Sequence, residues 1–168
     1  MRVERPGRVH GPAWTELGER LLVHAPVLLA AARSMTLDEA EAQDLVQTTL
    51  EIGLRHADQL RDPRALRPWL LTIEAREAFR LTRRLRRLVR LDRTVHQLAA
   101  AGDPLADRVA VRRALADLPP RTRAAIVLHH MAGLSVAETS KALGTSGNTV
   151  KTQLRLGLAR LRELLADD

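Results

Sequence analysis

Residues 133–155 read GLSVAETSKALGTSGNTVKTQLR, and this stretch predicts a short helix, a tight turn and a longer helix. Ser135 and Glu138 have the spacing of a capping box, in which a serine hydroxyl and a glutamate carboxylate satisfy amide donors at the start of a helix. Gly144 can adopt the left-handed conformation that ends the short helix, and Ser146 can cap the next one. The pattern is typical of a helix-turn-helix.

The longer helix of this motif is predicted to have one apolar face and one polar flank. The apolar face consists of Val150, Leu154, Leu158, Leu161 and Leu165. The polar flank near the N-terminus consists of Ser146, Asn148, Thr149, Lys151, Thr152 and Arg155. Asn and Arg can form paired hydrogen bonds with base edges, whereas Lys, Thr and a helix N-terminus suit phosphates. A solvated helix face is the alternative, but the capping box, the glycine turn and the charge together favour insertion into the major groove.

Composition agrees with a nucleic-acid partner. The formal net charge is +7 and the isoelectric point is near 11.3, so polyanions attract the chain. Hydrophobic residues make up 45% and aromatic residues 2% of the sequence, which contains no cysteine. This mixture favours helices, excludes a disulfide scaffold and indicates a reducing compartment. Because no apolar run is long enough to cross a bilayer and no signal peptide is recognisable, we expect a cytoplasmic protein without direct membrane insertion.

The residues before the motif predict a second helical unit. A helical pattern begins near Ala13, is interrupted at Pro26 and continues to about Met35; Thr36 or Asp38 can cap the next helix. A turn at residues 61–64 precedes a long helix, and periodicity is lost between about residues 90 and 107. We therefore predict an all-α protein of two small helical domains: a flexible tail (1–12), an N-terminal bundle (13–89), a linker (90–107) and a C-terminal helix-turn-helix domain (108–168).

Two surfaces of the N-terminal bundle are candidates for binding. Asp44, Gln47 and Glu51 recur at helical spacing and form a polar stripe that could dock on a partner. The turn and the end of the long helix carry cations that could follow a single-stranded backbone, namely Arg61, Arg64, Arg76, Arg80, Arg83 and Arg84. The alternative for the helix end is a solvated, self-repelling arginine run. Trp69 is predicted to pack in the core rather than stack on a base.

Both units resemble parts of one protein family. In the C-terminal unit the matching residues are LADLPP at 115–120, GLSVAE at 133–138, TVKT at 149–152 and LARLR at 158–162. In the N-terminal unit they are AP at 25–26, LL at 28–29, DLVQ at 44–47, DPRA at 62–65 and WL at 69–70. The chain resembles the extracytoplasmic-function sigma factors, group IV of the sigma-70 family, with region 2 preceding region 4.

The resemblance implies a function and a set of partners. Region 4 of this family binds the minus-thirty-five promoter element, which implies that role for the flank from Ser146 to Arg155. In region 2, the resemblance implies that the stripe through Asp44 and Gln47 docks on the clamp of core RNA polymerase. It further implies that the turn at 61–65 and the following helix melt the minus-ten element. The expected protein is a sigma factor that initiates transcription and is restrained by an anti-sigma factor, with no catalytic activity, cofactor or metal of its own.

Departures from the family pattern keep a second function open. The family often has acidic residues at the positions of Gln43 and Thr48, an asparagine at Arg76, and an acidic or neutral residue at Arg80. The polymerase-binding face is therefore less acidic than the family pattern, and a base-reading amide is replaced by a cation. The Gly147-Asn148 order also differs from the usual turn into the recognition helix. The alternative is a sigma-like adaptor or regulator that binds a partner or DNA but does not initiate alone.

Two further classes fit the sequence less well. A response-regulator type of activator would have a similar C-terminal motif, but the N-terminal half shows neither the alternating strand and helix pattern nor the acidic pocket of that class. For an enzyme, the adjacent His129 and His130 are the remaining candidates, and we expect them to point in different directions as packing or surface residues. No carboxylate pair or nucleophile accompanies them.

Overall fold

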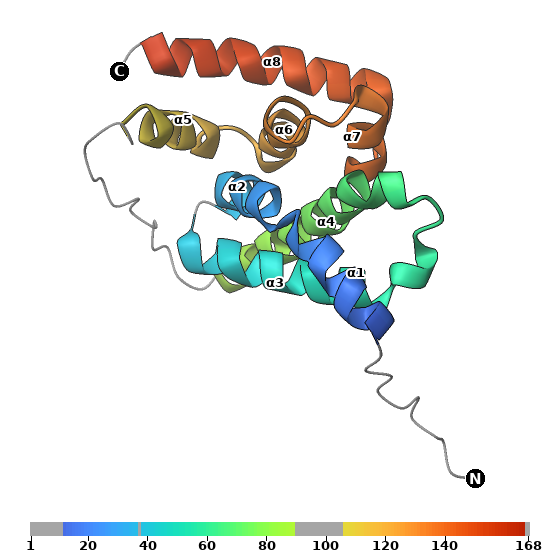
Figure 1. Ribbon diagram of the computed structural model, residues 1–168. Coiled ribbons are helices and arrows are strands. Elements are labelled where there is room, and N and C mark those ends of the chain that lie inside the picture. Colours follow the sequence, from blue (N-terminus) through green and yellow to red (C-terminus); the bar gives the residue numbers. More distant parts are fainter. Residues whose placement is uncertain (1–11, 37, 90–105, 167–168) are drawn as a thin grey trace.

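The computed structural model describes residues 12–36, 38–89 and 106–166, and within these ranges the regular structure is entirely helical (Figure 1). The N-terminal unit contains α1 (Pro12–Leu22), α2 (Ala25–Thr36), α3 (Glu39–Arg55), the short turns η1 (Ala57–Gln59) and η2 (Pro63–Ala65), and α4 (Leu66–Val89). The C-terminal unit contains α5 (Ala106–Ala116), α6 (Pro120–Ile126), the π-helical turn η3 (Val127–Met131), α7 (Val136–Leu143) and α8 (Gly147–Ala166). The all-α prediction is confirmed. The predicted tail and linker lie almost wholly outside the described residues.

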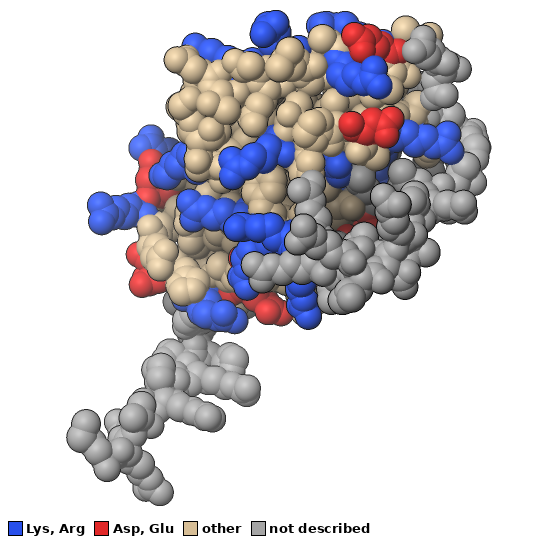
Figure 2. Space-filling model, turned by 180° about the vertical axis from the view of Figure 1, so that it is seen from behind, with Lys and Arg blue, Asp and Glu red and all other residues tan. Residues whose placement is uncertain are grey.

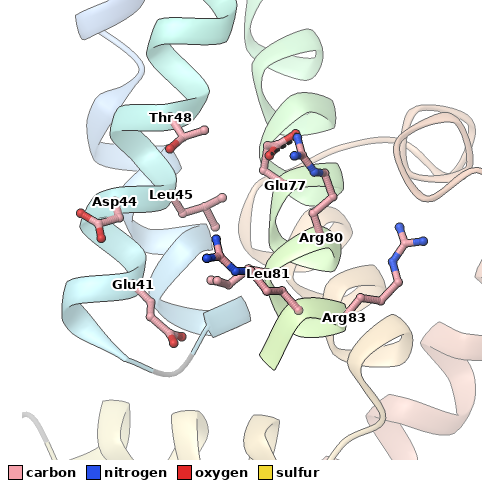
Figure 3. Close-up of a pocket in the computed structure, with 9 residues that line it drawn as sticks. Glu41, Asp44, Leu45, Thr48, Glu77, Arg80, Leu81 and Arg83 are labelled. Atoms are coloured by element: carbon pink, nitrogen blue, oxygen red, sulfur yellow. Dashed lines mark hydrogen bonds and ion pairs between the residues drawn. The ribbon is translucent and has the colours of Figure 1, made fainter. Parts of the chain in front are cut away.

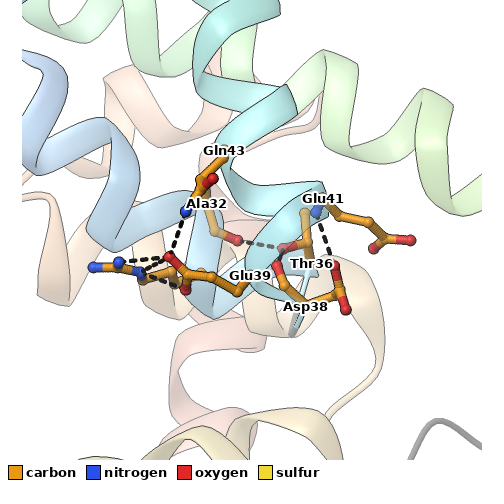
Figure 4. Close-up of polar contacts among 7 residues, drawn as sticks. Ala32, Thr36, Asp38, Glu39, Glu41 and Gln43 are labelled. Carbon is orange, nitrogen blue, oxygen red and sulfur yellow. Dashed lines mark hydrogen bonds and ion pairs between the residues drawn. The ribbon is translucent and has the colours of Figure 1, made fainter.

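Polar contacts define where α3 begins (Figure 4). The Asp38 side chain accepts a hydrogen bond from the Glu41 amide at 2.8 Å, whereas the Thr36 hydroxyl donates back to the Ala32 carbonyl at 2.9 Å. Of the two predicted caps, Asp38 is therefore the N-cap of α3, because its side chain accepts from a free amide in the first turn. Arg33 on α2 forms an ion pair with Glu39 at 2.6 Å, and this pair joins the end of α2 to the start of α3.

The core of the N-terminal unit lies between α2, α3 and α4. Leu28, Leu70 and Leu71 are fully buried. A Cβ added at Gly53 would lie 2.8 Å from a methyl group of Leu70, so the glycine permits α3 and α4 to approach closely. This packing leaves the opposite side of α3 and part of α4 exposed.

The two units pack against each other along a seam, which we define as the contact of α2 and α4 with α6, η3 and α7. The buried residues of both units form one continuous apolar cluster. Arg67 on α4 donates to the Ala132 carbonyl at 2.6 Å, and Arg123 on α6 donates to the Met35 carbonyl at 3.2 Å. The sequence analysis predicted two separately packed units and did not predict this contact. The patterns in the sequence concern each unit alone and carry no information about how the two units pack together.

One buried side chain conflicts with its surroundings. Glu74 on α4 has no exposed surface, and neither carboxylate oxygen has a hydrogen-bond partner among the described residues. Burial raises the pKa of Glu74 to about 9, so the side chain is neutral at pH 7. A neutral but unpartnered carboxyl group still loses its hydrogen bonds to water when the chain folds.

We expect the buried Glu74 carboxyl group to make the stability of the fold depend on pH. The pKa of Glu74 rises from 4.5 to about 9 on folding, so the folded state binds the proton more tightly. The free energy of unfolding therefore falls as pH rises between these values, and the replacement Glu74→Gln should remove that part of the dependence. Glu74→Met should raise the free energy of unfolding by about 1–3 kcal/mol near neutral pH. Urea titrations at several pH values measure both effects.

Glu163→Gln is the matched control for this experiment. Glu163 is exposed and pairs with Arg160 at 3.0 Å, so its replacement should leave the pH dependence of unfolding unchanged. If Glu74→Gln and the unmodified chain show the same pH dependence of unfolding, the Glu74 carboxyl group is not buried in the folded protein.

Candidate nucleic-acid and polymerase interfaces

The helix-turn-helix is built by the caps that the sequence predicted. The Ser135 hydroxyl accepts from the Glu138 amide at 3.2 Å, and the Glu138 carboxylate accepts from the Ser135 amide at 2.8 Å. Gly144 has φ of 61°, the left-handed conformation that favours glycine. The Ser146 hydroxyl then accepts from the Thr149 amide at 3.1 Å and starts α8. The capping box, the glycine turn and the second cap are all confirmed.

The polar flank of α8 is open to solvent. Ser146, Asn148, Thr149, Lys151, Thr152 and Arg155 are all exposed. On the other side of the helix, Val150, Leu154 and Leu161 are buried as predicted. The prediction for Leu165 was wrong, since 41% of it is exposed, while Leu164 packs against the core. With 3.6 residues per turn, a face followed in steps of four drifts off the core within two or three turns.

Gly157 sets the distance between α8 and α6. A Cβ at this position would lie 2.8 Å from Cγ2 of Thr122 and 3.2 Å from Ile126, so the two helices meet at the glycine. Sequence reasoning missed this residue and assigned the buried position to its neighbour Leu158, which is half-buried. The role of Gly157 could not be predicted from the sequence, because it depends on the contact between α6 and α8, which are distant in sequence.

The predicted polymerase stripe is a continuous exposed surface on α3. Asp44, Gln47 and Glu51 are exposed, and the Gln47 amide donates to Glu51 at 3.0 Å. Beside the stripe lies an apolar groove of about 820 Å³ between α1, α2 and α3. Its lining includes Leu22, Leu29, Val46, Leu50 and Leu54, together with Gln47 and Glu51 of the stripe.

The structure divides the predicted arginines between two places. A cleft of about 680 Å³ between α3 and α4 is lined by Arg80, Arg83 and Arg84 on one side and by Glu41 and Asp44 on the other (Figure 3). Within it, Arg80 pairs with Glu77 at 3.0 Å. Seen from behind, the molecule shows a band of Lys and Arg side chains across its middle (Figure 2). The positive charge therefore covers one face broadly, with acidic side chains interspersed.

Of the remaining predicted arginines, Arg61 and Arg76 line a pocket beside the turn after α3, and Arg64 does not. This pocket, of about 580 Å³, is lined by Gln59, Arg61, Asp62, Trp69 and Arg76 of the N-terminal unit, and by Glu138 and Lys141 of α7. Trp69 is half-buried and packs against the core, as predicted, but it also lines the pocket. Arg64 is 91% exposed and pairs with Asp62 at 3.2 Å. The sequence did not reveal this pocket, because its walls come from the turn after α3, from α4 and from α7, which is distant in sequence.

The two adjacent histidines do not point in different directions as predicted. The ring centroids of His129 and His130 are 4.7 Å apart in an edge-to-face arrangement, and both lie in the π-helical turn, which alters the angular spacing of an α-helix. The His129 ring donates to the Leu134 carbonyl at 2.6 Å. No group of three potential metal ligands occurs among the residues described.

Comparisons with known proteins agree with these features. The family model for sigma-70 region 2 matches residues 22–88, and that for sigma-70 region 4 matches residues 108–161. The chain is 33% identical to the RNA polymerase sigma-E factor of Streptomyces coelicolor over 89% of its own length and 86% of the relative's. The chain belongs to the sigma-70 family, among the ECF RNA polymerase sigma factors.

Other relatives and solved structures support the same assignment. The ECF RNA polymerase sigma factor SigM of Mycobacterium tuberculosis is 32% identical, over 84% of this chain and 73% of the relative. The sigma factor RpoE from Bartonella quintana, solved in complex with the anti-sigma factor NepR, has a TM-score of 0.80 and 29% identity, over 92% of this chain and 99% of that one. CnrH, solved with the cytosolic domain of CnrY, has a TM-score of 0.69 and 28% identity, covering 92% of this chain and 90% of that one. Within the described part of this sigma factor, no helix is both long and apolar enough to cross a membrane.

Gly157→Ala should destabilise the sigma factor by about 1–3 kcal/mol, because the added methyl group meets Thr122 and Ile126 inside a packed contact. Gly18→Ala in α1 is the matched control: no atom lies within 4 Å of the added Cβ, so the replacement should stabilise by about 0.5–1 kcal/mol. Thermal and urea unfolding of both variants measure the difference. Equal effects of the two replacements would contradict the close approach of α6 and α8.

Proposed function

We propose that this sigma factor brings core RNA polymerase to promoters by presenting the N-terminal flank of α8 to the major groove of the minus-thirty-five element. The observation that carries the proposal is that the six polar residues of this flank are all exposed, on a helix whose start is fixed by a cap. Asn148 and Arg155 are suited to base edges, while Lys151, the threonines and the helix N-terminus are suited to phosphates. Duplex recognition therefore needs no rearrangement of the C-terminal unit.

The pocket around Trp69 and Arg76 is the proposed site for an unstacked base of the minus-ten element. Its volume of about 580 Å³ exceeds what one base requires, and it combines an aromatic ring with the cations Arg61 and Arg76. Proteins bind single-stranded DNA by stacking bases on aromatic side chains and by attracting the phosphate backbone to arginine. Arg80, Arg83 and Arg84 extend the positive surface along α4 and supply charge to the strand that leaves the pocket.

The stripe of Asp44, Gln47 and Glu51 is the proposed contact with the polymerase clamp, and the apolar groove beside it enlarges that surface. Two of the solved structures similar to this chain contain a partner protein, in one of them an anti-sigma factor. We infer that an anti-sigma factor also restrains this chain. The sigma factor acts in the cytoplasm, where RNA polymerase works, and the polymerase carries out the bond-forming chemistry without a cofactor or metal from this chain.

A sigma-like adaptor remains the second candidate, and the pairing of Arg80 with Glu77 favours it. A side chain already engaged with a neighbouring carboxylate offers less charge to DNA, which would weaken promoter melting while leaving polymerase binding intact. Run-off transcription with core polymerase separates the two functions. A pull-down from native lysate at moderate salt identifies the partners. Recovery of polymerase subunits, of an anti-sigma factor or of neither would each favour a different function.

Arg155→Ala should weaken binding to a promoter duplex by about 1–3 kcal/mol if Arg155 contacts a base. If it contacts a phosphate, the loss should be uniform across sequences and the salt dependence of binding should decrease. Fluorescence anisotropy over a range of salt concentrations distinguishes the two. Arg162→Ala is the control, because Arg162 is exposed on the same helix but two turns beyond the flank. Equal affinities of both variants and the unmodified chain would remove Arg155 from the site.

Asp44→Arg should reduce association with core polymerase about tenfold or more, because it reverses one of the two negative charges of the stripe. The same variant should bind promoter duplex as tightly as the unmodified chain, since α3 lies apart from α8. Pull-down with purified core polymerase and run-off transcription measure the effect, with Glu163→Arg as a charge-matched control on α8. Undiminished polymerase binding would show that the stripe is not the docking surface.

A further inference from the structure

One large apolar side chain lies on the polar side of α8. Leu156 is 55% exposed, and it is not part of the apolar cluster that the described residues form. It lies four residues beyond Thr152 and seven beyond Thr149, so with 3.6 residues per turn the three project from the same side of the helix. Val150 and Leu154 are buried on the other side. Leu156 therefore belongs to the surface proposed for the major groove.

The position of Leu156 along α8 also fits this surface. From Asn148 to Leu156 the helix rises by roughly 12 Å, which is about the width of the major groove. Glu163 lies seven residues further along the same side and pairs with Arg160 at 3.0 Å. Phosphates repel a carboxylate, so this part of the helix is unsuited to contact with DNA. Leu156 thus lies between the polar residues near the N-terminus and the turn at which the charge of this side changes.

The chemistry of the side chain restricts what Leu156 can contact in the groove. A single exposed leucine is common on protein surfaces, so its surroundings carry the argument. The other exposed residues of this part of α8 can all form hydrogen bonds, namely Asn148, Thr149, Lys151, Thr152 and Arg155. Leucine can neither donate nor accept, so it suits neither phosphates nor the polar edges of bases. The apolar group that a base pair presents in the major groove is the C5-methyl group of thymine.

We propose that Leu156 determines part of the promoter specificity by packing against the C5-methyl group of one thymine in the major groove. The inference rests on the proposed insertion of the α8 flank into the minus-thirty-five element and extends it. Contacts with phosphates position the helix but carry no information about sequence. The contact of Leu156 adds a preference for thymine at one position, beside the bases that Asn148 and Arg155 are suited to read.

Selection from a random duplex library, with the full-length chain and with Leu156→Ala, tests this preference. The unmodified chain should enrich thymine at a position where Leu156→Ala does not, and the preferences at the other positions should remain. Thermal unfolding of the two proteins should coincide, because Leu156 is exposed and lies outside the core cluster. Identical preferences of the two proteins would overturn the inference. If the unmodified chain enriches no sequence, the duplex role of α8 fails, and the inference fails with it.

Deoxyuridine tests the methyl group itself. It pairs with adenine as thymine does and lacks only the C5-methyl group, so the hydrogen-bonding groups in the groove are unchanged. Each thymine of the selected duplex is replaced in turn. At one position the replacement should weaken binding of the unmodified chain about three- to fivefold, which is the effect of losing one buried methyl-sized group. Leu156→Ala should already bind the thymine duplex more weakly and should lose nothing further with deoxyuridine at that position.

Two variants serve as controls for the deoxyuridine experiment. Leu165→Ala removes another exposed leucine of α8, nine residues beyond Leu156, and should keep the full dependence on the methyl group. Leu156→Met keeps an apolar side chain and should retain most of that dependence. Fluorescence anisotropy at a fixed salt concentration measures each combination of protein and duplex. If the unmodified chain and Leu156→Ala respond equally to deoxyuridine at every position, the inference is wrong, whereas specific binding of the duplex leaves the proposed role of α8 intact.

Discussion

The burial of a common apolar cluster beneath α2, α4, α6 and η3 is the constraint on which the other features depend. Because α4 directs Leu70, Leu71 and Ala75 inward, only its remaining surface is left for Arg76 and the arginines that follow. In α3, the inward face leaves the polar stripe outside for the same reason. In α8, contact with α6 at Gly157 determines which flank is free. Each proposed interface is thus the part of a helix that the core does not use.

The features that were predictable from the sequence depend on neighbouring residues. The capping box at Ser135 and Glu138, the cap at Asp38 and the left-handed Gly144 each involve contacts within five positions, so the residue types alone indicate them. The helix-turn-helix and the all-α class follow from such signals. The exposed residues of α8 were also predictable, because the period of a helix assigns its faces over the first few turns.

The features that were not predictable depend on distances between segments. The role of Gly157 requires the position of Thr122, and the pocket around Trp69 requires the turn, α4 and α7 together. The burial of Glu74 is a further case, since a glutamate in a helix normally indicates an exposed position. All three are tertiary properties that no local pattern encodes.

The unequal exposure of the proposed interfaces implies an order of engagement. The α8 flank and the α3 stripe are exposed in this structure, whereas the base pocket has α7 as a wall. The ion pair of Arg80 with Glu77 does not change this order, because neither residue lines the base pocket. Duplex and polymerase can therefore bind first, at surfaces that are already exposed. The base pocket, which α7 helps to enclose, is then the last of the three proposed surfaces to be engaged.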